Sequence, residues 1–210
     1  MRVLLMRPNS KVFNLCIPLG LLYLASTLRR QNEVQVMDAR LDRTPEQGLR
    51  RVLREFRPDL VGISLLTVEA GAGHRDAAIV KEELPDCRVV VGGPYSSSEP
   101  IAAVRDKNVD VSVRGEGEET LAELAESFSG GARLAHVKGI AYRQDGRPVV
   151  NPERPPVQDL DRLPLPAYDL VQVERYFQGT SGYTQNMMQV KPRAMPIFSS
   201  RGCPYSCVYC

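Results

Sequence analysis

Leu60-Val-Gly-Ile-Ser-Leu-Leu66 is an almost continuous apolar run within the first third of the chain. A strand with one face in water alternates apolar and polar residues, whereas a parallel strand that is covered on both faces does not. Four other short runs rich in β-branched residues precede residue 130: Arg2–Met6, Val34–Asp38, Arg88–Val91 and Asp110–Arg114. The sequence therefore predicts five strands of a parallel sheet.

Helical segments separate these runs. Two of them place apolar residues at positions i, i+3, i+4 and i+7, namely Leu49, Val52, Leu53 and Phe56, then Leu121, Leu124, Ala125 and Phe128. A broader apolar face over residues 21–28 predicts a more deeply buried helix. Strands that alternate with helices predict an α/β protein with a doubly wound, Rossmann-like sheet, most simply in flavodoxin-like order.

The composition is that of an ordinary soluble protein. The 210 residues include 27 basic and 25 acidic side chains, so the chain lacks the strongly basic character that nucleic-acid binding favours. The uncharged stretch 12–28 contains Asn14 and Pro18, and it is shorter than the ~20 apolar residues that a membrane span needs. We therefore expect a cytoplasmic protein with no nucleic-acid or membrane partner.

The pattern changes after residue 135. Residues 139–151 predict a β-hairpin that turns at Asp145-Gly146. Six prolines between Pro148 and Pro166 exclude a regular helix or ladder there. Ala194–Ser200 predicts one short strand. We accordingly divide the chain into an α/β domain over residues 1–135, a hairpin and proline-rich connector over 136–192, and the start of a second domain over 193–210.

Three cysteines close the chain in C-x3-C-x2-C spacing: Cys203, Cys207 and Cys210. Three thiolates that converge on a [4Fe–4S] cluster leave one iron without a protein ligand, which keeps it open for a substrate or cofactor. A structural zinc site usually takes four ligands, and no fourth cysteine or histidine lies nearby. Zinc and unrelated thiols remain the alternatives to the cluster.

The motif Arg201-Gly-Cys-Pro-Tyr-Ser-Cys-Val-Tyr-Cys210 resembles that of the radical S-adenosylmethionine (SAM) enzymes. The preceding residues resemble the cobalamin (B12)-binding domain that lies before many radical SAM domains. The blocks that carry this second resemblance are Pro18-Leu-Gly-Leu-Leu-Tyr-Leu-Ala25, Val61-Gly-Ile-Ser64, Val91-Gly-Gly-Pro94, Arg114-Gly-Glu-Gly-Glu-Glu119 and Asp159-Leu-Asp-Arg-Leu-Pro-Leu-Pro166.

The resemblance implies three cofactors: a [4Fe–4S] cluster, SAM and cobalamin. Small residues at the carboxyl ends of the strands would line the pocket for the dimethylbenzimidazole tail of cobalamin, namely Ser64, Thr67, Gly92, Gly93 and Pro94. By the same resemblance Gly115 and Glu116 would lie near the corrin rim. Tyr209 would flank the SAM adenine, or else pack within a barrel. No side chain is identified as catalytic.

One motif of the resemblance is missing. B12 domains that ligate cobalt through histidine carry D-x-H-x-x-G, but the residues after the second predicted strand are Asp38-Ala-Arg-Leu-Asp-Arg43. The guanidinium of Arg40 stays protonated and does not ligate cobalt. His74 and His136 give little sign of a ligand role. Cobalamin is therefore expected to bind without a histidine ligand, unless this domain has lost it.

The resemblance implies the N-terminal portion of a radical SAM enzyme, whose partial (β/α) barrel begins at the predicted strand 194–200 and is truncated after Cys210. Such an enzyme cleaves SAM reductively, for methyl transfer or ring rearrangement, and takes electrons from a donor such as flavodoxin or ferredoxin. We expect this chain alone to be inactive. The alternatives are a cobalamin carrier or sensor without catalysis, and a flavodoxin-like module for another nucleotide. The substrate, a small molecule or peptide, is not indicated.

Overall fold

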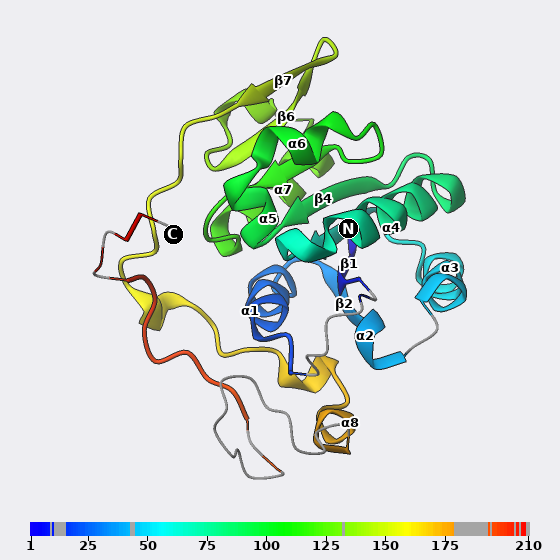
Figure 1. The fold of residues 1–210 in the computed structure, drawn as a ribbon, viewed down its shortest axis with the longest axis vertical. Helices are drawn as coiled ribbons and strands as arrows, with labels where there is room; N and C mark the ends of the chain where they lie inside the picture. The colour runs from blue at the N-terminus through cyan, green and yellow to red at the C-terminus, as the bar shows by residue number, and fades with distance from the viewer. Residues whose placement is uncertain are drawn as a thin grey trace.

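The computed structural model describes residues 1–8, 10, 16–42, 45–131, 133–178, 193, 195–203, 205, 207 and 208. Within these residues a single sheet of seven strands has the order β2-β1-β3-β4-β5-β6-β7 (Figure 1). The strands are β1 (Arg2–Arg7), β2 (Glu33–Asp38), β3 (Leu60–Ser64), β4 (Arg88–Gly92), β5 (Val111–Val113), β6 (Ile140–Gln144) and β7 (Arg147–Val150). The first five strands pair in parallel, so the predicted α/β class and flavodoxin-like order are confirmed.

Helices connect the parallel strands. The α-helices are α1 (Leu19–Leu28), α2 (Ala39–Asp42), α3 (Pro45–Phe56), α4 (Ala70–Glu83), α5 (Pro94–Ser98), α6 (Pro100–Arg105), α7 (Glu118–Gly130) and α8 (Val173–Gln178). Short 3-10 helices are η1 (Thr67–Glu69), η2 (Leu134–His136), η3 (Leu160–Arg162) and η4 (Tyr168–Leu170). In the described residues no helix is both long and apolar enough to cross a membrane.

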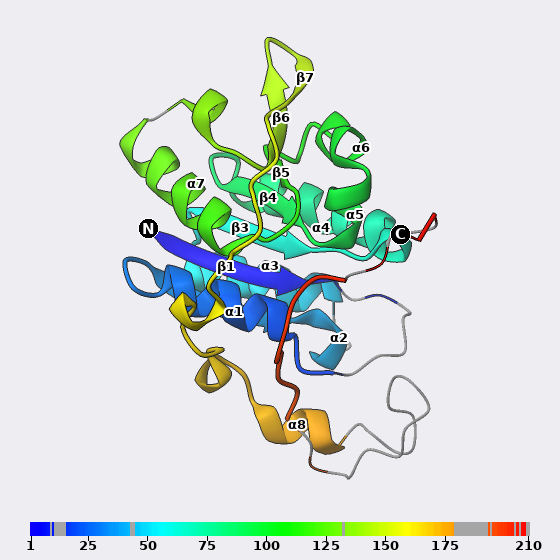
Figure 2. The same cartoon turned by 90° about the vertical axis from the view of Figure 1, so that its left-hand side faces the viewer.

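The alternation of side chains along each strand builds two cores. On β1, Leu4 packs with α3, α4 and α6, whereas Leu5 packs on the opposite face with α1 and α7. All the central strands are covered on both faces, which is why their sequences are continuous apolar runs. Figures 1 and 2 show the resulting three layers, with the sheet between the two sets of helices.

The predicted hairpin forms and extends the sheet. β6 pairs antiparallel with both β5 and β7, and its turn falls at Asp145 and Gly146, which have φ of 50° and 77°. Asn151, directly after β7, is buried and donates to the carbonyls of Leu134 and Val137, both at 2.7 Å. These contacts attach the hairpin to the α/β domain.

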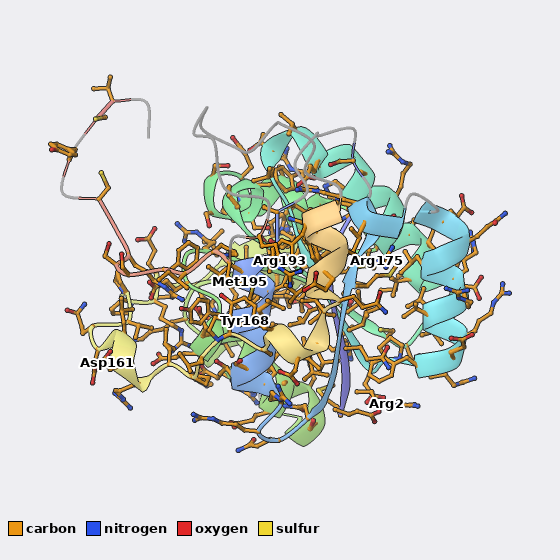
Figure 3. The ribbon with its side chains drawn as sticks, turned by 90° about the horizontal axis from the view of Figure 1, so that it is seen from below. Arg2, Asp161, Tyr168, Arg175, Arg193 and Met195 are labelled. Carbon is orange, nitrogen blue, oxygen red and sulfur yellow. The ribbon has the colours of Figure 1, made fainter. Side chains whose placement is uncertain are left out.

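The proline-rich connector runs along the domain past α1 and reaches α8, as the yellow and orange ribbon shows (Figure 1). The Ala167 amide donates to the Leu22 carbonyl at 3.1 Å, and the Ser26 hydroxyl donates to the Leu165 carbonyl. The Tyr168 hydroxyl in turn donates to the carbonyl of Pro196, next to Met195 (Figure 3). The connector therefore holds the C-terminal segment close to α1.

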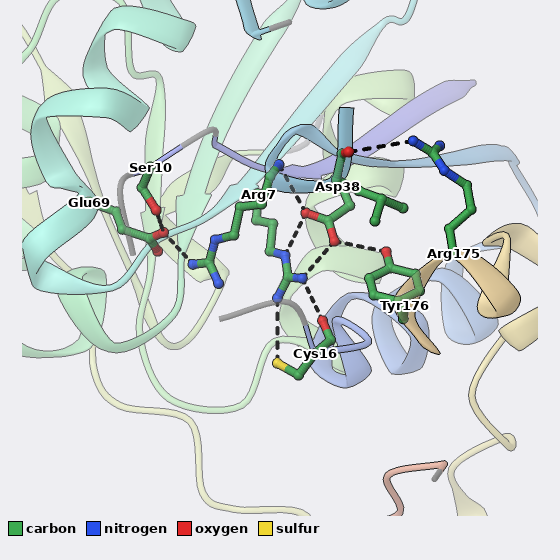
Figure 4. A network of polar contacts seen from close by, with 9 residues as sticks. Arg7, Ser10, Cys16, Asp38, Glu69, Arg175 and Tyr176 are labelled. Carbon is green, nitrogen blue, oxygen red and sulfur yellow. Dashed lines mark hydrogen bonds and ion pairs between the residues drawn. The ribbon is translucent and has the colours of Figure 1, made fainter. Parts of the chain in front are cut away.

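A buried ion pair at the end of β1 anchors α8. The Arg7 guanidinium donates to both carboxylate oxygens of Asp38, at 2.7 and 2.6 Å, and also to the Cys16 carbonyl (Figure 4). Tyr176 of α8 donates its hydroxyl to Asp38 at 2.8 Å. Burial, together with the Asp38 carboxylate, raises the pKa of Tyr176, so the hydroxyl stays protonated as a donor.

The strand predicted over residues 194–200 is not present in the part of it that the structure describes. Residues 195–200 have no strand conformation, and Ala194 lies outside the described residues. A strand needs a neighbour for its backbone hydrogen bonds, and within the described residues none pairs with this segment. The start of a barrel is therefore not shown.

Candidate functional site

A cavity of about 460 Å³ lies at the carboxyl end of the sheet, between its strands and helices α1 and α7. Apolar side chains form most of its wall: Leu5, Val90 and Val113 from the strands, and Leu21, Leu24 and Leu121 from the two helices. Open parallel sheets bind ligands at this edge, beside the point where the strand order reverses. The cavity lies over β1, β3 and β4, next to the point between β1 and β3 where the strand order β2-β1-β3-β4 reverses direction.

Missing side chains on β3 and β4 create the space. Along β4, Val90 and Gly92 face the cavity while Val91 faces the other core. A Cβ atom added to Gly92 would have only the Val113 Cβ within 4 Å, at 3.9 Å. On β3 a Cβ at Gly62 would lie 2.8 Å from the Leu5 side chain. Glycine at both positions keeps the floor of the cavity flat and open.

Gly93 shapes the turn at the cavity rim. Its φ of 89° is in the left-handed region, and an added Cβ would lie 2.9 Å from the Leu65 carbonyl oxygen. The Leu65 amide donates to the Gly92 carbonyl at 2.9 Å, which ties this turn to the end of β3. A side chain at Gly93 would therefore strain the backbone and collide with the end of β3.

The structure brings five of the predicted cobalamin residues together, because Ser64, Gly92, Gly93, Gly115 and Glu116 all line the cavity. The other two do not line it. Thr67 opens η1 and Pro94 opens α5, and neither reaches the cavity wall. Tyr209 lies outside the described residues.

Sequence reasoning missed the residues that close the cavity. Glu118 has only the local signature of an acidic helix start, Arg201 is known from the sequence only as the first residue of the cysteine motif, and Phe198 has no signature, yet all three line the cavity. Gly62 did carry a signal, because an isolated glycine in a buried strand often marks a close approach of another group. The contact between Glu118 and Arg201 spans 83 positions and leaves no local pattern.

Arg201 lies across the mouth of the cavity. Its guanidinium donates to Glu118 at 2.6 Å, lies 3.4 Å from Glu116, and stacks over the Tyr23 ring with its carbon 5.2 Å from the ring centre. Burial opposes its charge, but the hydrogen bonds and charges of Glu118 and Glu116 outweigh this and raise the pKa of Arg201. Arg201 therefore remains a cation that joins α1 to the start of α7.

The predicted cluster ligands begin two residues further on. Cys203 and Cys207 are exposed free thiols, and Cys210 lies outside the described residues. Among the residues that the structure describes, no three histidine, cysteine or acidic side chains lie close enough to hold a metal ion. The iron–sulfur site thus stays a prediction from the sequence.

Neither histidine of the chain reaches the cavity. The two ring nitrogens of His74 contact Asp106 at 2.7 Å and Tyr95 at 3.1 Å, and His136 is exposed on η2. Arg40, which stands where a histidine would be expected, forms an ion pair with the buried Glu69. A ligand in the cavity would therefore meet mostly apolar side chains and glycine, together with the polar groups of Glu116, Glu118 and Arg201, and no imidazole. These surroundings fit a flat aromatic base such as the tail of cobalamin.

A protein-family comparison agrees with this geometry. The model of the B12-binding domain matches residues 9–125, which is more than half of the chain. The chain belongs to the B12-binding domain family. The match begins just after β1 and extends through β5 and most of α7, and so includes most of the cavity wall apart from Leu5 of β1 and the residues at its mouth.

Relatives of this B12-binding domain come from longer proteins. An uncharacterized methyltransferase of Pyrococcus horikoshii is 33% identical over an alignment of 197 residues that covers 92% of this chain and 40% of the relative. The anaerobic magnesium-protoporphyrin IX monomethyl ester cyclase of Rubrivivax gelatinosus is 31% identical over 222 residues, covering 100% of this chain and 38% of the cyclase.

A solved structure is similar as well. The radical SAM methyltransferase TsrM from Kitasatospora setae, with cobalamin and a [4Fe–4S] cluster bound, matches with a TM-score of 0.65 and 27% identity over 72% of this chain and 30% of that protein. This B12-binding domain is thus related to the N-terminal part of cobalamin-dependent radical SAM enzymes. The chain spans about 40% of the length of the curated relatives described above.

Proposed function

We propose that this chain is the cobalamin-binding N-terminal part of a radical SAM enzyme that carries out methyl transfer or a ring rearrangement. The observation that carries the proposal is the glycine-floored apolar cavity, whose mouth is covered by the residues that lead into the cysteine motif. One fold would thereby place two cofactor sites next to each other. The methyltransferase and cyclase relatives support these two reaction types.

The chain's own residues would bind and orient the cofactors. Leu21, Leu24 and Leu121 would enclose the cobalamin base and exclude water, while Gly62 and Gly92 leave room for it. Gly115 and Glu116 at the rim would contact the corrin. No histidine of the described residues lines the cavity, so this chain would bind cobalamin without a histidine ligand to its metal.

The cysteine motif would hold the cluster through Cys203, Cys207 and Cys210, with Tyr209 beside the SAM adenine. When bound, the cluster and SAM supply a carbon radical, and cobalamin supplies a carrier for methyl groups. An external donor such as a flavodoxin or ferredoxin would provide the electron. The substrate would be a small molecule or peptide.

Anaerobic reconstitution with iron and sulfide tests the cluster assignment in the protein made from its full reading frame. We expect about four irons per chain, and a large loss of iron in Cys203→Ala, Cys207→Ala and Cys210→Ala. The matched control is Cys87→Ala, because Cys87 is buried in the core at 4% exposure.

Two outcomes would contradict the enzyme assignment. Iron content that is equal in the control and the motif variants would exclude the motif as the cluster site. A folded protein that binds cobalamin but no iron would instead be a carrier or sensor.

A further inference from the structure

Residues 198–202, here called the lid, lie across the mouth of the cavity. Phe198, Ser200, Arg201 and Gly202 all line it. The Phe198 ring stacks on Tyr23 of α1, with ring centres 5.9 Å apart and planes within 9°. Figure 2 shows the red C-terminal segment running from beside α8 past α1. The lid thus rests on one wall of the cavity through an aromatic contact.

An ion pair fixes the lid to the opposite wall. The acceptor, Glu118, is the first residue of α7, and its side chain is only 6% exposed. Glu116 is held in place by the Val157 amide, which donates to its carboxylate at 2.6 Å. Opening the lid would leave the buried Glu118 carboxylate without Arg201, which is costly because a buried charge needs a partner.

We propose that Arg201 is a positioning residue: its ion pair with Glu118 keeps the lid closed over a bound ligand and fixes where the cysteine motif begins. The inference rests on the proposed function, since cobalamin is taken as the ligand. Gly202 and Cys203 follow Arg201 directly, so the same ion pair that slows ligand release also sets the first cluster cysteine at the cavity mouth.

The rate of cobalamin release tests this role. The sequence contains no tryptophan, so Phe198→Trp places the one indole of the chain on the lid, where it can be excited selectively. In that background, with hydroxocobalamin as the probe, fluorescence recovery after dilution gives the dissociation rate. We expect Glu118→Gln and Arg201→Gln each to accelerate release about tenfold or more, equivalent to ~1.4 kcal/mol. The double variant should release no faster than Arg201→Gln alone, because both single changes remove the same ion pair with Glu118.

Two further variants separate a positioning role from general damage. Arg201→Lys keeps the charge and should recover part of the slow release. Arg29→Gln removes an exposed ion pair with Asp169, 2.8 Å long and outside the cavity lining, and should leave the rate within about twofold of the parent. Unchanged rates in Glu118→Gln, or effects of the two single variants that simply add, would overturn the proposal.

The ligand-free chain gives a second readout. In the Phe198→Trp background, acrylamide quenching of the introduced indole should increase in Glu118→Gln if the ion pair holds the lid. Equal quenching in parent and variant would overturn the proposal. Failure of a well-folded chain to bind hydroxocobalamin would remove the proposed function, and the quenching result would still decide the role of Arg201.

Discussion

Gly92→Phe should weaken the binding of hydroxocobalamin by about 100-fold or more. Position 92 shares the cavity face of β4 with Val90, and an added Cβ meets only Val113, so the benzyl group has free access to the cavity. The phenyl ring would occupy the space of the aromatic base, so the base could no longer be buried there. A 100-fold loss of affinity corresponds to ~2.7 kcal/mol of binding free energy, which is modest for losing the burial of an aromatic group.

The matched control for this variant is Gly130→Phe. Gly130 is exposed at the end of α7, and nothing lies within 4 Å of an added Cβ there. We expect the control to bind hydroxocobalamin as the wild type does, as measured by equilibrium titration at matched far-UV circular dichroism. A folded Gly92→Phe chain with unchanged affinity would mean that the ligand binds elsewhere. Gly93 is a poorer choice, because its left-handed backbone would be strained by any side chain.

Asp38→Ala should lower the free energy of unfolding by about 3–5 kcal/mol. The side chains of Arg7 and Asp38 are 8% and 3% exposed, so the variant leaves a buried guanidinium without its carboxylate. It also removes the acceptor of Tyr176 and so weakens the attachment of α8. Urea unfolding of the 210-residue chain measures the change.

Two comparison variants give this result its meaning. Tyr176→Phe removes only one hydrogen bond and should cost about 0.5–1.5 kcal/mol. Asp169→Ala breaks the ion pair with Arg29, in which the Asp169 side chain is 61% exposed. This variant should change the free energy of unfolding by less than about 1 kcal/mol. If Asp38→Ala cost no more than Asp169→Ala, the buried pair would not be what holds the connector to the domain.

The strands could be predicted because burial on both faces leaves a local signature. Each predicted strand from β1 to β5 lies within two residues of the observed one at either end. The Asp145-Gly146 turn was equally visible, since a two-residue hairpin needs positive φ at both positions. The buried strands and this turn are determined by residues that are close together in the sequence, so a local sequence pattern can predict them.

The closure of the site could not be predicted in the same way. Which strand residues share a cavity depends on the sheet order, and the pairing of Arg201 with Glu118 joins residues far apart in the chain. Thr67 and Pro94 follow strands as the other predicted residues do, but each begins a helix that carries it away from the cavity. A residue that follows a strand can thus be predicted to lie at the carboxyl edge of the sheet, but its individual contacts cannot be predicted in this way.

The most direct test of the account is titration of the 210-residue chain with hydroxocobalamin, followed by absorbance. We predict saturable binding of one cobalamin per chain, with a spectrum that lacks nitrogen coordination below the metal and is the same in His74→Ala and His136→Ala. A well-folded chain that binds none, or a spectrum that changes when either histidine is removed, would contradict the assignment of this cavity to cobalamin.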